Sequence, residues 1–132
     1  MGRRWQVANL TNLLGFIACD QGDLDAAAGY FRRALPITQE IRAISMTLDV
    51  LCGVALLKLL QGDLIQAAEL LGLALAHPLA SADVKNTAEP ILDALRAHPS
   101  ADTAIIEAAR ARGAALDVDT TVAAFLAETA AD

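Results

Sequence analysis

The hydrophobic positions of this 132-residue chain recur at helical spacing and are interrupted at intervals by Gly-Asp and His-Pro pairs. Ala and Leu supply most of the apolar positions, and both residues are strong helix formers. Glycine after an apolar run and the residue before a proline both mark the ends of helices. The pattern therefore predicts an all-α protein with about seven helices.

The tetrapeptide Gln-Gly-Asp-Leu occurs twice, beginning at Gln21 and again forty residues later at Gln61. Each copy is preceded by an apolar run and followed by a second run with the same placement of small and large residues. The matched pairs are Ala27 with Ala67, Ala28 with Ala68, Phe31 with Leu71, Ala34 with Ala74 and Leu35 with Leu75. The chain therefore contains an internal repeat of helix, tight turn and helix.

The repeated Gly-Asp pair predicts the geometry of both turns. Gly22 and Gly62 are expected to end the first helix of each copy, because glycine adopts the left-handed conformation at little cost. Asp23 and Asp63 are expected to cap the second helices by accepting backbone N–H groups. Ala27 and Ala67 are small where two helices are expected to cross closely.

The stretch "NLLGFIACDQGDLDAAAGYFRRAL" resembles a tetratricopeptide repeat: it has Leu-Gly-aromatic in the first helix, Gly-Asp at the turn, then spaced Ala, Phe and Ala-Leu. The second copy keeps the turn and second helix but has Val-Ala-Leu for Leu-Gly-aromatic. The period of forty exceeds the usual repeat of about 34 residues and is similar to MalT-like repeats of large bacterial signalling ATPases and transcription regulators. The resemblance implies an α-solenoid of antiparallel helix hairpins and a protein–protein interaction module. The sequence contains no catalytic constellation and no Gly-rich phosphate loop, so enzymatic activity is not expected.

The domain is expected to contain two such hairpins over residues 1–80 and a degenerate helical C-terminal cap over residues 81–132. In the cap we expect one helix from a Ser81 N-cap to about residue 97, one over 101–112 closed by Gly113 and one over 120–130 capped by Asp119. Proline disrupts helix interiors, so Pro90 should kink or split its helix and Pro36 should bend the second helix of the first repeat.

The resemblance also implies a concave groove lined by the first helix of each hairpin, which receives a peptide or a partner helix. The positions carried over are Asn9, Asn12, Phe16 and Cys19 from the first repeat, and Asp49, Cys52, Leu56 and Leu59 from the second. No Lys or Arg accompanies the asparagines, which argues against recognition of a peptide carboxylate. A mostly apolar groove favours a helix or an adjoining segment of the same polypeptide. In the alternative interpretation, Phe16, Leu56 and Leu59 are core between repeats.

The first helix carries more apolar residues than one hairpin partner can cover. They are Trp5, Val7, Leu10, Leu13, Leu14 and Ile17, and we expect self-association through this face, with Trp5, Leu10, Leu13 and Ile17 as its main residues. Repeat arrays normally carry polar end units, and the chain starts directly in a repeat helix. This favours the C-terminal part of a longer array in a bacterial regulator. A short native protein that forms a homodimer is the alternative.

Charge and composition exclude several other classes. Residues 1–62 carry a net charge of +1 and residues 63–132 a net charge of −7, so binding to nucleic acid is not expected. No apolar run reaches the roughly 20 residues that cross a bilayer. Cys19 and Cys52 lack metal-ligand spacing and are expected to be reduced thiols of a cytoplasmic protein. His77 and His98 each precede a proline, a placement that fits helix ends better than catalysis or metal binding. No cofactor is expected.

Overall fold

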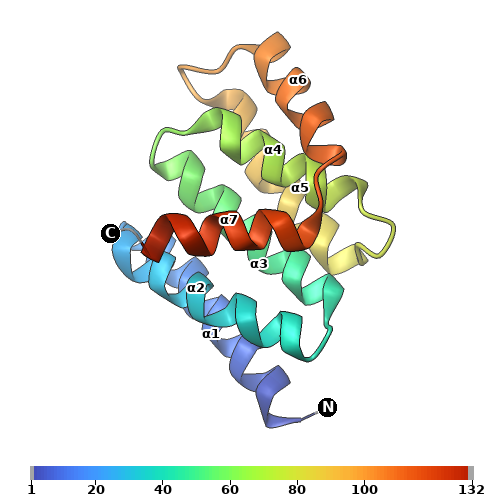
Figure 1. The fold of residues 1–132 in the computed structure, drawn as a ribbon. Helices are drawn as coiled ribbons and strands as arrows, with labels where there is room; N and C mark the ends of the chain where they lie inside the picture. Colours follow the sequence, from blue (N-terminus) through green and yellow to red (C-terminus); the bar gives the residue numbers. More distant parts are fainter. Residues whose placement is uncertain (1, 131–132) are drawn as a thin grey trace.

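The computed structural model describes residues 2–130, and these residues form seven α-helices (Figure 1). The helices are α1 (Arg3–Asp20), α2 (Leu24–Glu40), α3 (Ile44–Leu60), α4 (Leu64–Ala76), α5 (Ala82–Ala97), α6 (Thr103–Ala114) and α7 (Val118–Ala130). Residue 1 and residues 131–132, which belong to the predicted first hairpin and to the predicted cap, lie outside the described residues. None of the described helices has the length and hydropathy needed to cross a membrane.

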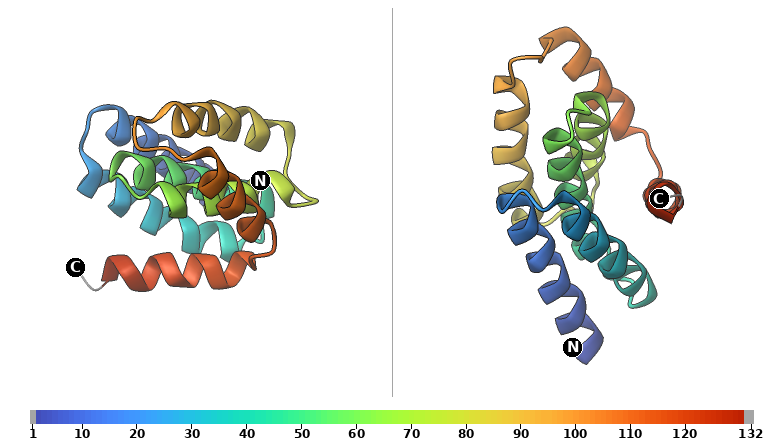
Figure 2. Two further views of the ribbon diagram at one scale, coloured as in Figure 1. Left: turned by 90° about the horizontal axis from the view of Figure 1, so that it is seen from above. Right: turned by 90° about the vertical axis from the view of Figure 1, so that its left-hand side faces the viewer.

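The helices build a short solenoid around α3. Helices α1 and α2 form one antiparallel hairpin and α3 and α4 form the next, with α3 packed against both α1 and α2. Helix α5 then packs on α3 and α4, and α6 packs along α4. Helix α7 returns to the first hairpin and lies against α2, on the side of α3 and α4 opposite to α5 (Figure 2). The predicted all-α solenoid is confirmed.

The two Gly-Asp turns have the predicted geometry. Gly22 and Gly62 have φ values of 76° and 85°. The Gly22 and Gly62 amides donate to the carbonyls three residues back, and the next amides donate to carbonyls five residues back. This is the Schellman arrangement, which satisfies carbonyls left free at a helix end. Asp23 and Asp63 accept the amides of Ala26 and Gln66 at 3.2 and 3.1 Å, so both predicted caps are confirmed.

A third turn of the same kind joins the two hairpins, between α2 and α3. The Arg42 amide donates to the Gln39 carbonyl and the Ala43 amide to the Thr38 carbonyl, which repeats the pattern at Gly22 and Gly62. Arg42 has a φ of 56°, so a residue with a Cβ occupies the left-handed region. The sequence did not predict this turn, because no glycine marks it.

The side chain of Phe31 fixes the packing of the first three helices. Phe31 is fully buried. A Cβ atom added to Gly15 of α1 would lie only 2.3 Å from its ring, and one added to Gly53 of α3 only 2.5 Å. The Phe16 ring meets it edge to face at a centroid distance of 5.7 Å. Two glycines on separate helices therefore form the slot that receives one aromatic ring.

A second pair of glycines brings α4 and α6 together. A Cβ on Gly72 would lie 2.2 Å from the Arg110 carbonyl oxygen, and a Cβ on Gly113 would lie 1.9 Å from the Glu69 carbonyl oxygen. The two backbones thus touch at their crossing. The prediction that Gly113 closes its helix was wrong: Gly113 lies within α6, where its lack of a side chain allows the crossing.

One helix cap differs from the expectation, and so does the expected split at Pro90. Helices α2 and α5 are continuous through Pro36 and Pro90, so Pro90 does not split its helix. Both prolines face solvent. Helix α7 begins at Val118. The Thr120 amide donates to the Asp117 Oδ2 at 2.9 Å, so the cap of α7 is Asp117 and not the predicted Asp119. The Ser81 cap of α5 is confirmed by its bond to the Val84 amide.

Replacing Gly53 with alanine should destabilise the fold by about 1–3 kcal/mol, because the added methyl group displaces the Phe31 ring in a closed core. Gly29→Ala is the matched control, since its Cβ meets no atom within 4 Å, and it should stabilise α2 by about 0.5–1 kcal/mol. Urea denaturation of both variants measures the effect. Equal stability of the two variants would contradict the slot at Phe31.

Replacing Arg42 with glycine should raise the unfolding free energy by about 0.5–1 kcal/mol. Relief of the left-handed strain, roughly 1–2 kcal/mol, exceeds the entropy cost of glycine. Arg42→Ala is the control, because it also removes the side chain but keeps the Cβ that causes the strain. Chemical denaturation should show a gain for glycine and none for alanine. A gain for both variants would assign the effect to the side chain.

Candidate functional site

A concave surface that includes the predicted groove residues Asn9 and Asp49 lies between α1, α3 and α5. It encloses a cavity of about 550 Å³. Its lining residues are Trp5 and Asn9 of α1, residues 43–46 and Asp49 at the start of α3, and Ser81, Asp83 and Val84 at the start of α5. We call this surface the A-helix groove. Two of its lining residues are acidic and none is basic.

The floor of the A-helix groove contains a buried polar pair. Asn12, buried in α1, donates its Nδ2 to the Asp49 Oδ2 at 2.8 Å. Burial raises the pKa of Asp49, and hydrogen bonds from Thr87 and Asn12 partly offset that rise. The Asn12 Oδ1 is buried and has no hydrogen-bond partner among the described residues. This oxygen is not accessible to a partner, so the acceptors that the groove presents are the carboxylates of Asp49 and Asp83.

The remaining predicted groove residues belong to the core. Cys19, Cys52 and Leu59 are buried, so no partner can reach their side chains. Phe16 and Leu56 are half-buried and pack against the same core. Burial raises the pKa of the Cys19 thiol to about 11 and that of the Cys52 thiol further. Both cysteines are free thiols, and their protonated form makes them poor nucleophiles.

The structure thus brings together only part of the predicted set. Asn9 and Asp49 line the A-helix groove, with Asn12 directly behind Asp49. Trp5, which the sequence assigned to a self-association face, also lines this groove. Ser81 and Asp83 of α5 were missed, because α5 lies outside the repeated pattern and gave no sign that it would form the third wall.

Helix α7 occupies the opposite side of the molecule and is held there by a buried cation. Val122 and Phe125 of α7 are buried against the rest of the molecule. The Lys58 ammonium of α3, which is also buried, bonds to the Glu128 carboxylate and lies 5.9 Å from the centre of the Phe125 ring. A buried charge is stable only when it is paired, so Lys58 fixes the position of α7.

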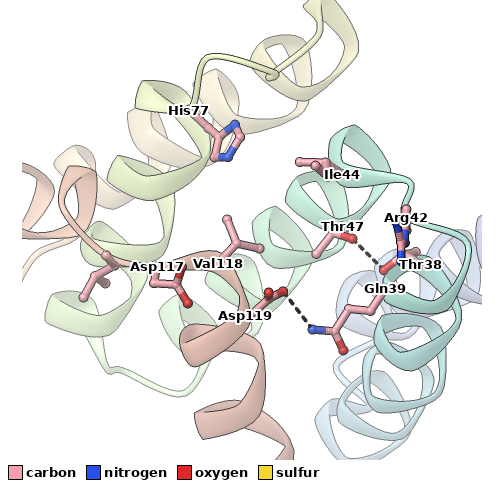
Figure 3. Close-up of a pocket in the computed structure, with 10 residues that line it drawn as sticks. Thr38, Gln39, Arg42, Ile44, Thr47, His77, Asp117, Val118 and Asp119 are labelled. Carbon is pink, nitrogen blue, oxygen red and sulfur yellow. Dashed lines mark hydrogen bonds between the residues drawn. The ribbon is translucent and has the colours of Figure 1, made fainter.

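A second cavity, of about 510 Å³, lies beside the start of α7. Its polar groups already bond to one another: Thr47 donates to Thr38 at 2.8 Å and Gln39 donates to Asp119 at 3.4 Å (Figure 3). The Nδ1 of His77 accepts the Leu79 amide at 3.0 Å. These residues shape the junction of α2, α4 and α7, which makes the A-helix groove the stronger candidate site.

Candidate metal ligands do not gather in the part of the chain that the structure describes. No three His, Cys, Asp or Glu side chains in this part of the chain come close enough to hold a metal ion. Each histidine accepts a hydrogen bond from a nearby backbone amide. The Nδ1 of His98 accepts one from Ser100, and the Nδ1 of His77 accepts one from Leu79.

A comparison with protein families finds one match over α1 to α4. A family model described as tetratricopeptide repeat matches residues 6–78, more than half of the chain. No curated protein matches the chain, and no solved structure does. The matched residues include both Gly-Asp turns and two walls of the A-helix groove, and they end before the third wall, α5.

Replacing Asp49 with asparagine should stabilise the fold at neutral pH. The pKa of Asp49 is raised in the folded state, so the folded protein binds this proton more tightly than the unfolded chain does. The folded state therefore loses stability as the pH rises above about 3.9, the pKa of an aspartate in an unfolded chain. An asparagine carries no such penalty, and its amide can donate to the free Asn12 Oδ1. In urea denaturation the advantage of Asp49→Asn over the parent should grow from pH 4 to pH 7. A constant difference would contradict the raised pKa.

Proposed function

We propose that this chain, which belongs to the tetratricopeptide repeat family, binds a segment of a protein partner, or of its own polypeptide, in the A-helix groove. Tetratricopeptide repeats generally mediate protein–protein interaction. The groove lies along the first helices of both repeats and is closed on its third side by α5. Its size, about 550 Å³, fits a few side chains of a bound helix or extended peptide.

The observation that carries this proposal is the excess of acceptors in the groove. Asp49 and Asp83 supply carboxylates to the groove, and no Lys or Arg lines it. A bound segment with Lys or Arg can donate charge-assisted hydrogen bonds to these carboxylates. The bound segment is therefore basic, in contrast to the carboxylate-bearing peptides that require Lys in the groove.

Trp5 provides the second feature of the site. It is half-buried at one side of the groove, where its ring face can receive an aliphatic stem or a cation, and Trp is the best aromatic partner for a cation. A Lys or Arg side chain has both parts, since its apolar stem packs on a ring while its charged head reaches a carboxylate. Trp5 and Asp83 thus favour the same kind of side chain.

The setting of this activity follows from the repeat type. The forty-residue period is similar to MalT-like repeats, which supports a role as the C-terminal scaffold or sensor part of a larger bacterial regulatory protein. The two free thiols support a cytoplasmic location. A structural homodimer is the second candidate function, favoured by a separate apolar face of α1.

Fluorescence of Trp5, the one tryptophan in the chain, tests the proposal directly. Helical synthetic peptides that carry a stripe of Lys should change its emission on titration, and the same peptides with Glu in place of Lys should not. Asp83→Lys should abolish the response. Glu89→Lys is the control, because it makes the same charge change at an exposed position of α5 outside the groove.

The control separates a local site from general attraction. Equal weakening by Asp83→Lys and Glu89→Lys would show that the peptides follow net charge and not the groove. A response to the Glu peptides as strong as that to the Lys peptides would contradict a basic partner. Circular dichroism of both variants checks that the helices remain folded.

A further inference from the structure

Helix α1 has apolar residues on its outer face that no described helix covers. Val7, Leu10, Leu14 and Ile17 are 44, 58, 43 and 42% exposed, and Leu13 beside them is 54% exposed. We call these five residues the α1 stripe. The opposite face of α1, with Ala8, Gly15 and Cys19, is buried in the core. The hairpin therefore folds without using the stripe, and α1 lies at the edge of the molecule (Figure 2).

In the second repeat, the corresponding face of α3 is buried. At the offset of forty residues, the stripe positions correspond in α3 to Thr47, Val50, Gly53, Val54 and Leu57. All five are buried. Four of the five stripe residues are larger than their counterparts, and one is of similar size. A face that is covered by a neighbouring helix in one repeat is thus left open in the other, with more apolar surface.

The spacing of the stripe identifies the shape that covers it. Val7, Leu10, Leu14 and Ile17 follow one another at intervals of three, four and three residues. These are the a and d positions of a heptad, the seam along which two helices pack as a coiled coil. The exposed apolar residues elsewhere, such as Leu79 and Ile105, form no such seam.

The seam is symmetric about its own centre. If two copies of α1 pack antiparallel about an axis beside residue 12, Val7 of one copy meets Ile17 of the other, and Leu10 meets Leu14. Leu13 of the two copies then flank the axis. Each contact occurs twice, which is the arrangement of an isologous two-fold interface and the commonest closed form of soluble oligomers.

The charges at the two ends of the stripe fit the antiparallel direction. Arg3 begins α1 and Asp20 ends it, and both are exposed. In the antiparallel pair, Arg3 of each copy lies near Asp20 of the other. The two helix dipoles also run in opposite directions, which brings ends of opposite partial charge together. In a parallel pair, arginine would face arginine and aspartate would face aspartate.

We infer that the protein forms a two-fold dimer in solution through antiparallel packing of the α1 stripe on a second copy of itself. A contiguous exposed apolar patch usually marks an interface, and five exposed apolar side chains on one helix face form such a patch. This inference rests on the α1 stripe and is independent of the A-helix groove.

Sedimentation velocity of the full chain over a series of micromolar concentrations tests the inference. The dimer fraction should rise with concentration in the parent. Leu10→Glu should weaken dimerisation by more than about tenfold, because it buries two unpaired carboxylates at the seam. Leu79→Glu is the matched control: Leu79 is 57% exposed, like Leu10, and the substitution should leave the dimer unchanged. Both variants should melt as cooperatively as the parent.

Charge reversal tests the direction of the helices. Arg3→Glu should weaken the dimer several-fold, and adding Asp20→Arg should restore it, because each reversed side chain again meets its opposite in the antiparallel pair. A monomer at every concentration overturns the inference. So does a dimer that Leu10→Glu leaves intact, or one that the second reversal fails to restore. Groove binding, measured by Trp5 fluorescence, should persist in Leu10→Glu, so the two proposals fail separately.

Discussion

The insertion of one aromatic ring between two helices is the interaction on which the rest of the fold depends. Phe31 of α2 enters a slot whose walls are Gly15 of α1 and Gly53 of α3. This contact sets the distance between the first hairpin and the second, because no side chain separates the ring from either backbone. The position of α3 relative to α1 in turn determines where the A-helix groove opens and which face of α1 remains outside.

Helix α3 is the centre of the molecule, and its environment explains the contrast with α1. It is packed by α1, α2, α4 and α5, and α7 covers the part of it that carries Lys58. A helix that is apolar on all sides is normally buried, and α3 meets this condition. Helix α1 is also apolar on two faces but has neighbours on only one. The same kind of helix therefore acts as core in the second repeat and presents a surface in the first.

The A-helix groove shows how a polar site is maintained next to such a core. Asn12 and Asp49 bond to each other across α1 and α3, and Ser45 of α3 donates to Ser81 at the start of α5 at 2.9 Å. The three walls of the groove are thus joined by polar contacts as well as by apolar packing. The carboxylates of Asp49 and Asp83 are the charged groups that this surface presents to a bound segment.

The amino-acid sequence by itself determined the helices, the repeat and two of the turns. Helical spacing and Gly-Asp pairs act over a few residues, so Gly22 and Gly62 could be assigned without a structure. The turn at Arg42 could not, since its left-handed conformation is imposed by the packing of α2 and α3 on either side. The continuity of α5 through Pro90 could not be predicted for the same reason: local preference is overridden when flanking turns are held in place.

Only the tertiary structure decided which faces of the helices are buried and which are open. Cys19, Cys52 and Leu59 fit a groove by their positions in the repeat, but α5 and the hairpin partners bury them. Of the residues expected to form a self-association face, Trp5 lines the groove, and Leu10, Leu13 and Ile17 are exposed on the outer face of α1. Gly113 changed from a helix end to a helix crossing. Burial is set by the neighbours that the whole chain supplies, and the order of residues along one helix does not contain that information.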